Sequence, residues 1–89
     1  MKLTVRSIRN PSRGPLGFAV DAPSGGEMEL ELFDVEGREV LRSMHQVNAG
    51  HSELAVPVTR RPMDPGSQLL FYRVSIAGER AVGRVVLLH

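Results

Sequence analysis

The fold is decided by EMELELFDVEG, residues 27–37. Apolar and acidic side chains alternate along its first part, with Met28, Leu30 and Leu32 in one parity and Glu27, Glu29 and Glu31 in the other. This alternation predicts a β-strand over 27–33, with one face in the core and the other in water. Asp34 and Gly37 then predict a tight turn, because Asp bonds nearby backbone and Gly accepts a positive φ. Residues 38–44 resume as a strand, which completes a β-hairpin.

The same alternation recurs on both sides of the hairpin. Strands are predicted over residues 2–6, 16–20, 27–33, 38–44, 52–58, 69–76 and 81–88. The stretches between them are rich in Gly, Pro, Asn and Ser, which favour turns over helix. Seven short strands with regularly spaced turns predict an all-β fold, namely a seven-stranded antiparallel immunoglobulin-like β-sandwich. We expect residues 1–89 to form a single domain.

Four strands carry more specific predictions. Pro57 predicts an edge position for 52–58. The apolar segment 69–76 is predicted to be a central strand buried on both faces, and the phenylalanines of the chain are expected in the core. Strand parity places Leu30 and Val86 inward, so aspartate at either position is expected to unfold the domain.

Length and composition limit the classes of function. An 89-residue chain holds one modest core and little room for a deep substrate cavity, so we expect that the protein is not an enzyme. The chain has no Cys, which excludes disulfide scaffolds and cysteine-based metal centres. Its formal net charge of +1 gives no strong field to attract nucleic acid or anionic lipid. No apolar run is long enough for a membrane span, and residues 1–6 lack an apolar stretch of signal-peptide length.

The residues that could carry chemistry have simpler interpretations. The three glutamates of 27–31 are interpreted as a solvated strand face, because an acid–base pair needs a cleft that separates its pKa values. Glu29→Lys is therefore expected to be nearly neutral for stability. His45 and His51 flank a turn and could approach each other across a hairpin, but with His89 they lack the spacing of a zinc site. We expect no metal and no other cofactor.

The order of several motifs is more informative than any one of them. Asn10-Pro11 comes first, and Phe33-Asp34-Val35-Glu36-Gly37-Arg38-Glu39-Val40 follows in the hairpin. Ala49-Gly50-His51, Phe71-Tyr72-Arg73-Val74 and a basic and apolar terminal strand, 84–89, come later. From about Asn10 to His89 the chain resembles the C-terminal sorting domains of type IX secretion substrates. It is equally similar to the related immunoglobulin-like domain named after the flagellar hook-capping protein.

The resemblance implies a non-catalytic sorting and anchoring module at the C-terminal end of a larger secreted protein, whose catalytic or binding domain would precede it. The outer-membrane translocation machinery of a Gram-negative bacterium would recognise the module in the periplasm, and the protein would be secreted or displayed on the cell surface. The implied recognition residues are Arg80, Arg84, Val85, Val86, Leu87, Leu88 and His89. Asp34 and Gly37 would set the structural turn. Nucleic acid and membrane insertion are not implied, and an exposed edge strand allows a dimer.

Two other classes of protein remain open. The domain could be a structural or accessory sandwich of a secreted enzyme, acting as a spacer or as a protein- or carbohydrate-interaction module. Carbohydrate binding would require exposed aromatic platforms, and the chain has one Tyr and no Trp. A small enzyme is the least supported class, because no catalytic constellation is visible.

Overall fold

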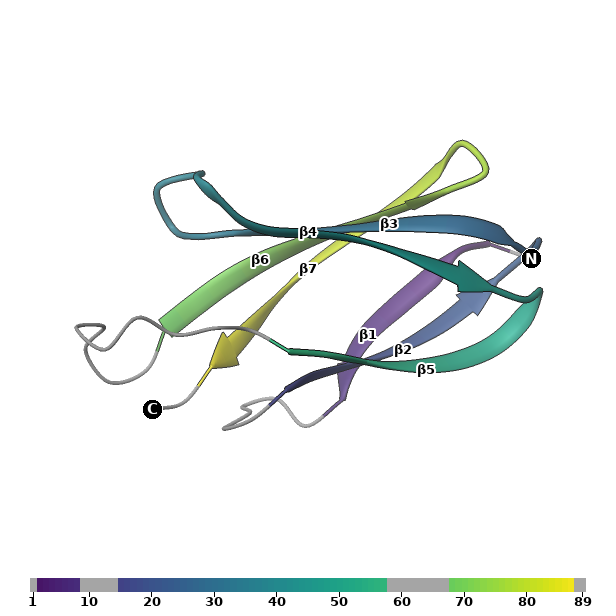
Figure 1. Ribbon diagram of the computed structural model, residues 1–89, viewed down its shortest axis with the longest axis horizontal. Coiled ribbons are helices and arrows are strands. Elements are labelled where there is room, and N and C mark those ends of the chain that lie inside the picture. Colours follow the sequence, from purple (N-terminus) through teal and green to yellow (C-terminus); the bar gives the residue numbers. More distant parts are fainter. Residues whose placement is uncertain (1, 9–14, 58–67, 88–89) are drawn as a thin grey trace.

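The computed structural model describes residues 2–8, 15–57 and 68–87 (Figure 1). Strands account for most of these residues and none of them is helical. The strands are β1 (Thr4–Ile8), β2 (Leu16–Ala22), β3 (Gly26–Phe33), β4 (Glu39–Val47), β5 (Gly50–Val56), β6 (Gln68–Ile76) and β7 (Glu79–Leu87). The all-β prediction is confirmed, and in the described ranges no helix is long and apolar enough to cross a membrane.

The strands form two antiparallel sheets that lie one above the other in Figure 1. The smaller sheet has the order β1-β2-β5, and the larger has the order β4-β3-β6-β7. β4 and β5 are joined by a short turn but belong to different sheets, so the chain crosses from one layer to the other there. The edge position expected from Pro57 is confirmed for β5, which ends immediately before this residue.

The core lies between the two sheets. The apolar parity of β3 faces inward as predicted, since Met28, Leu30 and Leu32 are almost fully buried. The opposite layer contributes the inward side of β2, which includes Phe18. The Phe18 and Tyr72 rings meet edge to face, with centroids 5.0 Å apart, an arrangement favoured between aromatic rings.

Two side chains of the larger sheet reach across to β1 and to the residue that precedes it. The Tyr72 hydroxyl donates to the carbonyl oxygen of Val5 at 3.2 Å, and the Leu3 N–H donates to the Glu79 carboxylate at 3.4 Å. Gly83 lies opposite Tyr72 in the β6–β7 ladder. A Cβ on Gly83 would overlap the Tyr72 ring and hydroxyl. Glycine at this position therefore lets Tyr72 reach β1.

Several finer predictions are wrong. β6 lies inside its sheet as expected, but it is buried on one face only, and Phe71 is 40% exposed. Phe33 is half-buried, so Phe18 is the only phenylalanine of the core.

The prediction that Val86 points into the core is also wrong. Val85 and Leu87 are buried, whereas Val86 points outward and is half-buried. Val86 lies on the same side of the strand as Arg84, and a charged residue indicates the solvent side, so Val85 and Leu87 are the residues that face the core.

Candidate functional site

The outward face of the larger sheet gathers most of the unusual side chains of the described residues. Antiparallel pairing places Arg42, Glu31, Arg73 and Val82 in one row across β4, β3, β6 and β7. The next row contains Phe33, Phe71 and Arg84. These residues belong to the parity opposite to the core on each strand. The sheet therefore combines charges from four separate segments with two aromatic rings.

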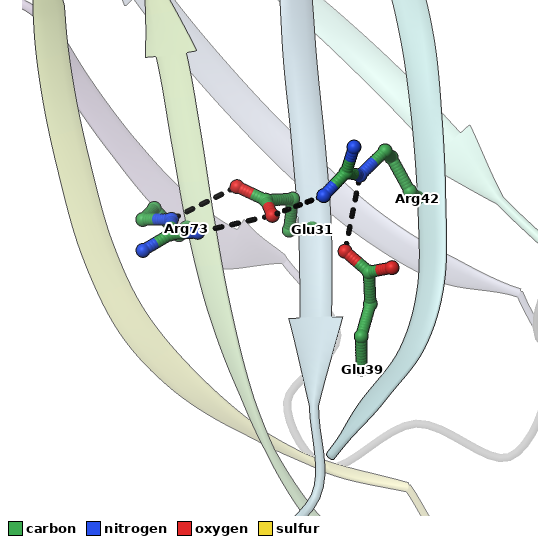
Figure 2. A network of polar contacts seen from close by, with 4 residues as sticks. All are labelled: Glu31, Glu39, Arg42 and Arg73. Carbon is green, nitrogen blue, oxygen red and sulfur yellow. Dashed lines mark hydrogen bonds and ion pairs between the residues drawn. The ribbon is translucent and has the colours of Figure 1, made fainter. Parts of the chain in front are cut away.

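Glu31 lies at the centre of this face and is only 3% exposed. Arg73 donates two parallel hydrogen bonds to its carboxylate, Nε to Oε1 at 2.9 Å and Nη2 to Oε2 at 3.0 Å (Figure 2). Arg42 donates from the opposite side, Nη2 to Oε2 at 3.3 Å, and also donates from Nε to Glu39 at 3.0 Å. The hydrogen bonds from Arg73 lower the pKa of Glu31, against the opposing effect of burial. The prediction of a solvated glutamate is therefore wrong for Glu31, whereas Glu27 is exposed as expected.

Neighbouring arginine stems explain how a carboxylate becomes buried on an outward face. Arg42 and Arg73 lie directly opposite Glu31 on the two adjacent strands. Their side chains remain partly exposed, and the long aliphatic stem of arginine is able to shield a shorter neighbour from water. The bidentate geometry is the strong form of the arginine–carboxylate pair. Glu31 is thus removed from water while all its charge is paired.

Beside this network lies an open apolar hollow of about 450 Å³. Its lining consists of Phe33, Phe71, Tyr72, Arg73, Val82, Gly83 and Arg84. The guanidinium of Arg73 stacks over the Phe33 ring, 5.2 Å from its centroid, which is within cation–π distance. Val82 is 69% exposed at its rim. The hollow is a surface feature suited to contact with another molecule.

The residues implied for recognition separate into three groups. Arg80 and Arg84 are exposed on the outward side of β7, which is an edge strand of its sheet. Val85 and Leu87 are core residues, and Val86 points outward. Leu88 and His89 lie outside the described residues. A partner could therefore touch the two arginines directly but not Val85 or Leu87.

The turn predicted at Asp34 and Gly37 is confirmed. One Asp34 carboxylate oxygen accepts from the backbone N–H groups of Glu36 and Arg38, both at 2.9 Å, and the other accepts from the Arg38 Nε at 3.0 Å. The backbone hydrogen bond from Arg38 is the main cause of a lowered Asp34 pKa. Gly37 has φ of +85°, which side chains of L-residues resist. Their place in the turn therefore fully explains the presence of Asp34 and Gly37.

His45 and His51 lie on strands of different sheets, and His89 lies outside the described residues. His45 on β4 contacts Ser43 at 2.8 Å, whereas His51 on β5 lies in the other sheet. The His51 ring bonds Glu53 at 3.2 Å and Asp21 at 3.0 Å, and these two carboxylates raise its pKa. Among the described residues no group of histidine and carboxylate side chains is arranged to hold a metal ion.

Reasoning from the sequence missed the network and the hollow. One signal was present, because Arg73 is the single charged residue in the otherwise apolar and small segment 69–76. A charge inside a central strand needs a partner on a neighbouring strand, and an acidic parity was already evident on β3. Which glutamate pairs with Arg73 depends on the register of β3 with β6, which the sequence does not reveal.

A scan against protein-family models, a search of curated proteins and a search of solved structures each found no match to this chain.

Proposed function

We propose that the domain is an immunoglobulin-like sandwich with a modified strand arrangement. In the constant-type immunoglobulin domain, the fourth strand pairs with the sheet that contains the first, second and fifth strands. Here β4 pairs with β3 instead, which gives sheets of three and four strands. The orders β1-β2-β5 and β4-β3-β6-β7 otherwise follow the immunoglobulin pattern. The turn at Asp34 and Gly37 favours this arrangement, since it joins β3 and β4 as an antiparallel hairpin.

We further propose that the domain is a non-catalytic sorting and anchoring module for type IX secretion. Two arguments support the proposal: the order of motifs from about Asn10 to His89, and the position of β7. The carrying observation is that β7 lies at a sheet edge with Arg80 and Arg84 exposed on its outward side. An edge strand presents backbone groups to which a partner strand adds, and its outward side chains then select the partner.

Burial restricts how such recognition would work. Because Val85 and Leu87 are packed in the core, a translocation partner reads the folded domain through the β7 backbone and the outward arginines. The partner is the outer-membrane translocation machinery, and the cargo is the protein that carries the domain. Secretion or surface display through the periplasm of a Gram-negative bacterium is part of this proposal.

The test is a fusion of residues 1–89 to the C-terminus of a periplasmic reporter in a host with type IX machinery. The expected result is reporter outside the cell, and less of it when Arg80→Glu and Arg84→Glu are combined. The control combines Lys2→Glu and Arg6→Glu, which change the net charge equally at exposed positions that are not part of β7. Retention of the unmodified fusion in the periplasm contradicts the sorting function. Equal loss in both double variants contradicts the assignment to β7.

The second candidate is a protein-interaction or spacer module of a secreted enzyme. It is favoured by the apolar hollow, which an inert tail would not need to expose. Carbohydrate binding is less well supported, because the described outward aromatic rings are limited to Phe33 and Phe71 and Phe33 is half-buried. This candidate predicts a folded fusion protein that remains in the periplasm and binds a partner through the larger sheet.

A further inference from the structure

We infer that the hollow on β3, β6 and β7 is a docking site for a protein segment that carries one large apolar side chain between two carboxylates. The inference goes beyond the proposed function, because it concerns what binds to the outward face of the folded domain rather than how the domain is secreted. Its test is carried out on the purified chain and does not involve the secretion machinery.

The apolar part of the surface requires a side chain from outside. Val82 is 69% exposed and Phe71 is 40% exposed on adjacent strands. Together with Phe33 they form a hollow of about 450 Å³, within the range of pockets that bind small ligands. Exposed apolar patches rimmed by polar residues typically mark interaction sites. The volume is ample for an aromatic or large aliphatic side chain.

The charges around the hollow specify what accompanies that side chain. Arg80, Val82 and Arg84 alternate along the outward side of β7, and neither arginine has an ion-pair partner among the described residues. Arg73, in contrast, is neutralised by Glu31. No carboxylate lines the described hollow. The complementary surface therefore contains carboxylates on both sides of an apolar group.

Strand geometry gives the spacing of this complement. Alternate residues of an extended chain point to the same side at intervals of roughly 6.6 Å. Arg80, Val82 and Arg84 follow this interval, so an extended segment with the pattern carboxylate–x–apolar–x–carboxylate matches them one to one. An opposite-charge pair across such a contact is favourable, and a like-charge pair is unfavourable.

The Glu31 network prepares the site before anything binds. Two hydrogen bonds fix the Arg73 guanidinium, which covers the Phe33 ring and forms one wall of the hollow. A wall that is already ordered loses little side-chain entropy on binding. The buried pair thus acts as a positioning device for the docking surface.

A second copy of the chain fits this surface poorly. A symmetric contact between two β7 strands centred on Val82 would place Arg80 against Arg84 of the other copy, which is repulsive. Charge complementarity therefore favours an acidic segment of a different protein.

Three capped peptides test the inference by NMR titration of the 15N-labelled chain. The matched probe is acetyl-Glu-Thr-Phe-Thr-Glu-amide, the uncharged probe replaces both Glu by Gln, and the truncated probe replaces Phe by Ala. The matched probe is expected to shift the amide signals of Phe71 and of residues 82–84 saturably. The uncharged probe should bind roughly threefold to tenfold more weakly, as expected for the loss of two exposed ion pairs. The truncated probe should produce no saturable shift.

Matched variants locate the site. Val82→Lys and Arg84→Glu should weaken binding of the matched probe, and both residues are exposed enough to tolerate the change. Met44→Lys alters an exposed apolar residue of the same face outside the hollow, and Arg6→Glu makes the same charge change on the other sheet. These two controls should bind normally.

Any of three results overturns the inference: equal binding of the charged and uncharged probes, shifts confined to another surface, or no saturable shift. Concentration-dependent shifts at Val82 without peptide also overturn it, because a second copy then occupies the face.

Discussion

Glu31 illustrates how one residue departs from the pattern to which it belongs. Glu27, Glu29 and Glu31 share a parity and a strand, yet only Glu31 lies between two arginines. Burying a charge without a partner costs much more than burying a paired one. The register of three strands therefore makes Glu31 a structural centre, while Glu27 remains a solvated residue.

The first prediction concerns the pH dependence that this pairing creates. Because the Glu31 pKa is lower in the folded protein than its ordinary value of 4.5, its ion pairs stabilise the fold fully above pH 4.5. That contribution is lost as the pH falls through the folded pKa. Glu31→Gln should lower the free energy of unfolding at pH 7 and flatten its decline below pH 4.5, as measured by urea unfolding at several pH values.

Glu29→Gln is the matched control for this prediction. Glu29 lies on the same face of β3, is half-buried and faces Met44 and Ser75 rather than arginine. Its variant should stay close to wild type at pH 7 and keep the steep acid decline. Indistinguishable pH profiles for the two variants would mean that the arginine pairs contribute nothing specific to Glu31.

At the scale of elements, the β3–β4 hairpin explains both the turn and part of the network. The register slips by one residue between Leu32 and Phe33, so Glu39 rather than Val40 lies opposite Phe33. Residues three apart on a regular strand point to opposite faces, and a bulge removes this restriction. Glu39 consequently reaches Arg42 at 3.0 Å. The slip adds a second carboxylate to the arginine that covers Glu31.

The second prediction tests the turn of this hairpin. Gly37→Ala should reduce the free energy of unfolding by about 1–2 kcal/mol, because a Cβ resists a left-handed backbone. No neighbouring atom lies within 4 Å of that Cβ, so the loss would come from the backbone alone. Gly37→Asn should cost less, since Asn accepts this conformation more readily. Equal stability of the Ala variant and wild type in urea unfolding would contradict the assigned φ.

The third prediction concerns the contact between β6 and β7 at Gly83. Gly83→Ala should destabilise the domain by about 1–3 kcal/mol, the usual penalty for overpacking, because the new Cβ meets the Tyr72 ring. The same change should cost less in a Tyr72→Leu background, where the ring and hydroxyl are gone. A double-mutant cycle in urea measures this coupling. Additive effects would show that the Tyr72 ring does not lie over Gly83.

For the whole molecule, stability depends on which set of alternate side chains in each strand faces the opposite sheet. Val85 is fully buried, whereas Val86 lies in the outward row with Leu69. The fourth prediction is that Leu30→Asp and Val85→Asp unfold the domain, since an unpaired buried charge costs several kcal/mol of a total of about 5–15 kcal/mol. Val86→Asp should fold and lose roughly 1 kcal/mol. Circular dichroism and thermal unfolding distinguish these outcomes, and a folded Val85→Asp variant would contradict the inward parity.

Local patterns were reliable wherever one strand could be interpreted alone. The alternation of 27–33, the Asp34–Gly37 turn and the edge position before Pro57 all depend on neighbours in sequence, and each is confirmed. The prediction for 69–76 failed because an apolar run on both sides of a strand does not reveal which face another layer covers. The prediction for Val86 was wrong although this residue shares its side of the strand with Arg80 and Arg84, which indicate the solvent face. His45 and His51 flank a turn as expected, and this turn leads from one sheet to the other instead of forming a hairpin.

An all-β chain with an amphipathic hairpin at its centre is predictable from the amino-acid order, because alternation and turn chemistry act over a few residues. The burial of Glu31 between Arg42 and Arg73, and the outward hollow shared by Phe33, Phe71 and Val82, arise only once the strands are assembled. These groups are brought together by strand order and register. Both are set by the packing of two whole sheets, since a shift of one residue turns every side chain of a strand to its other face.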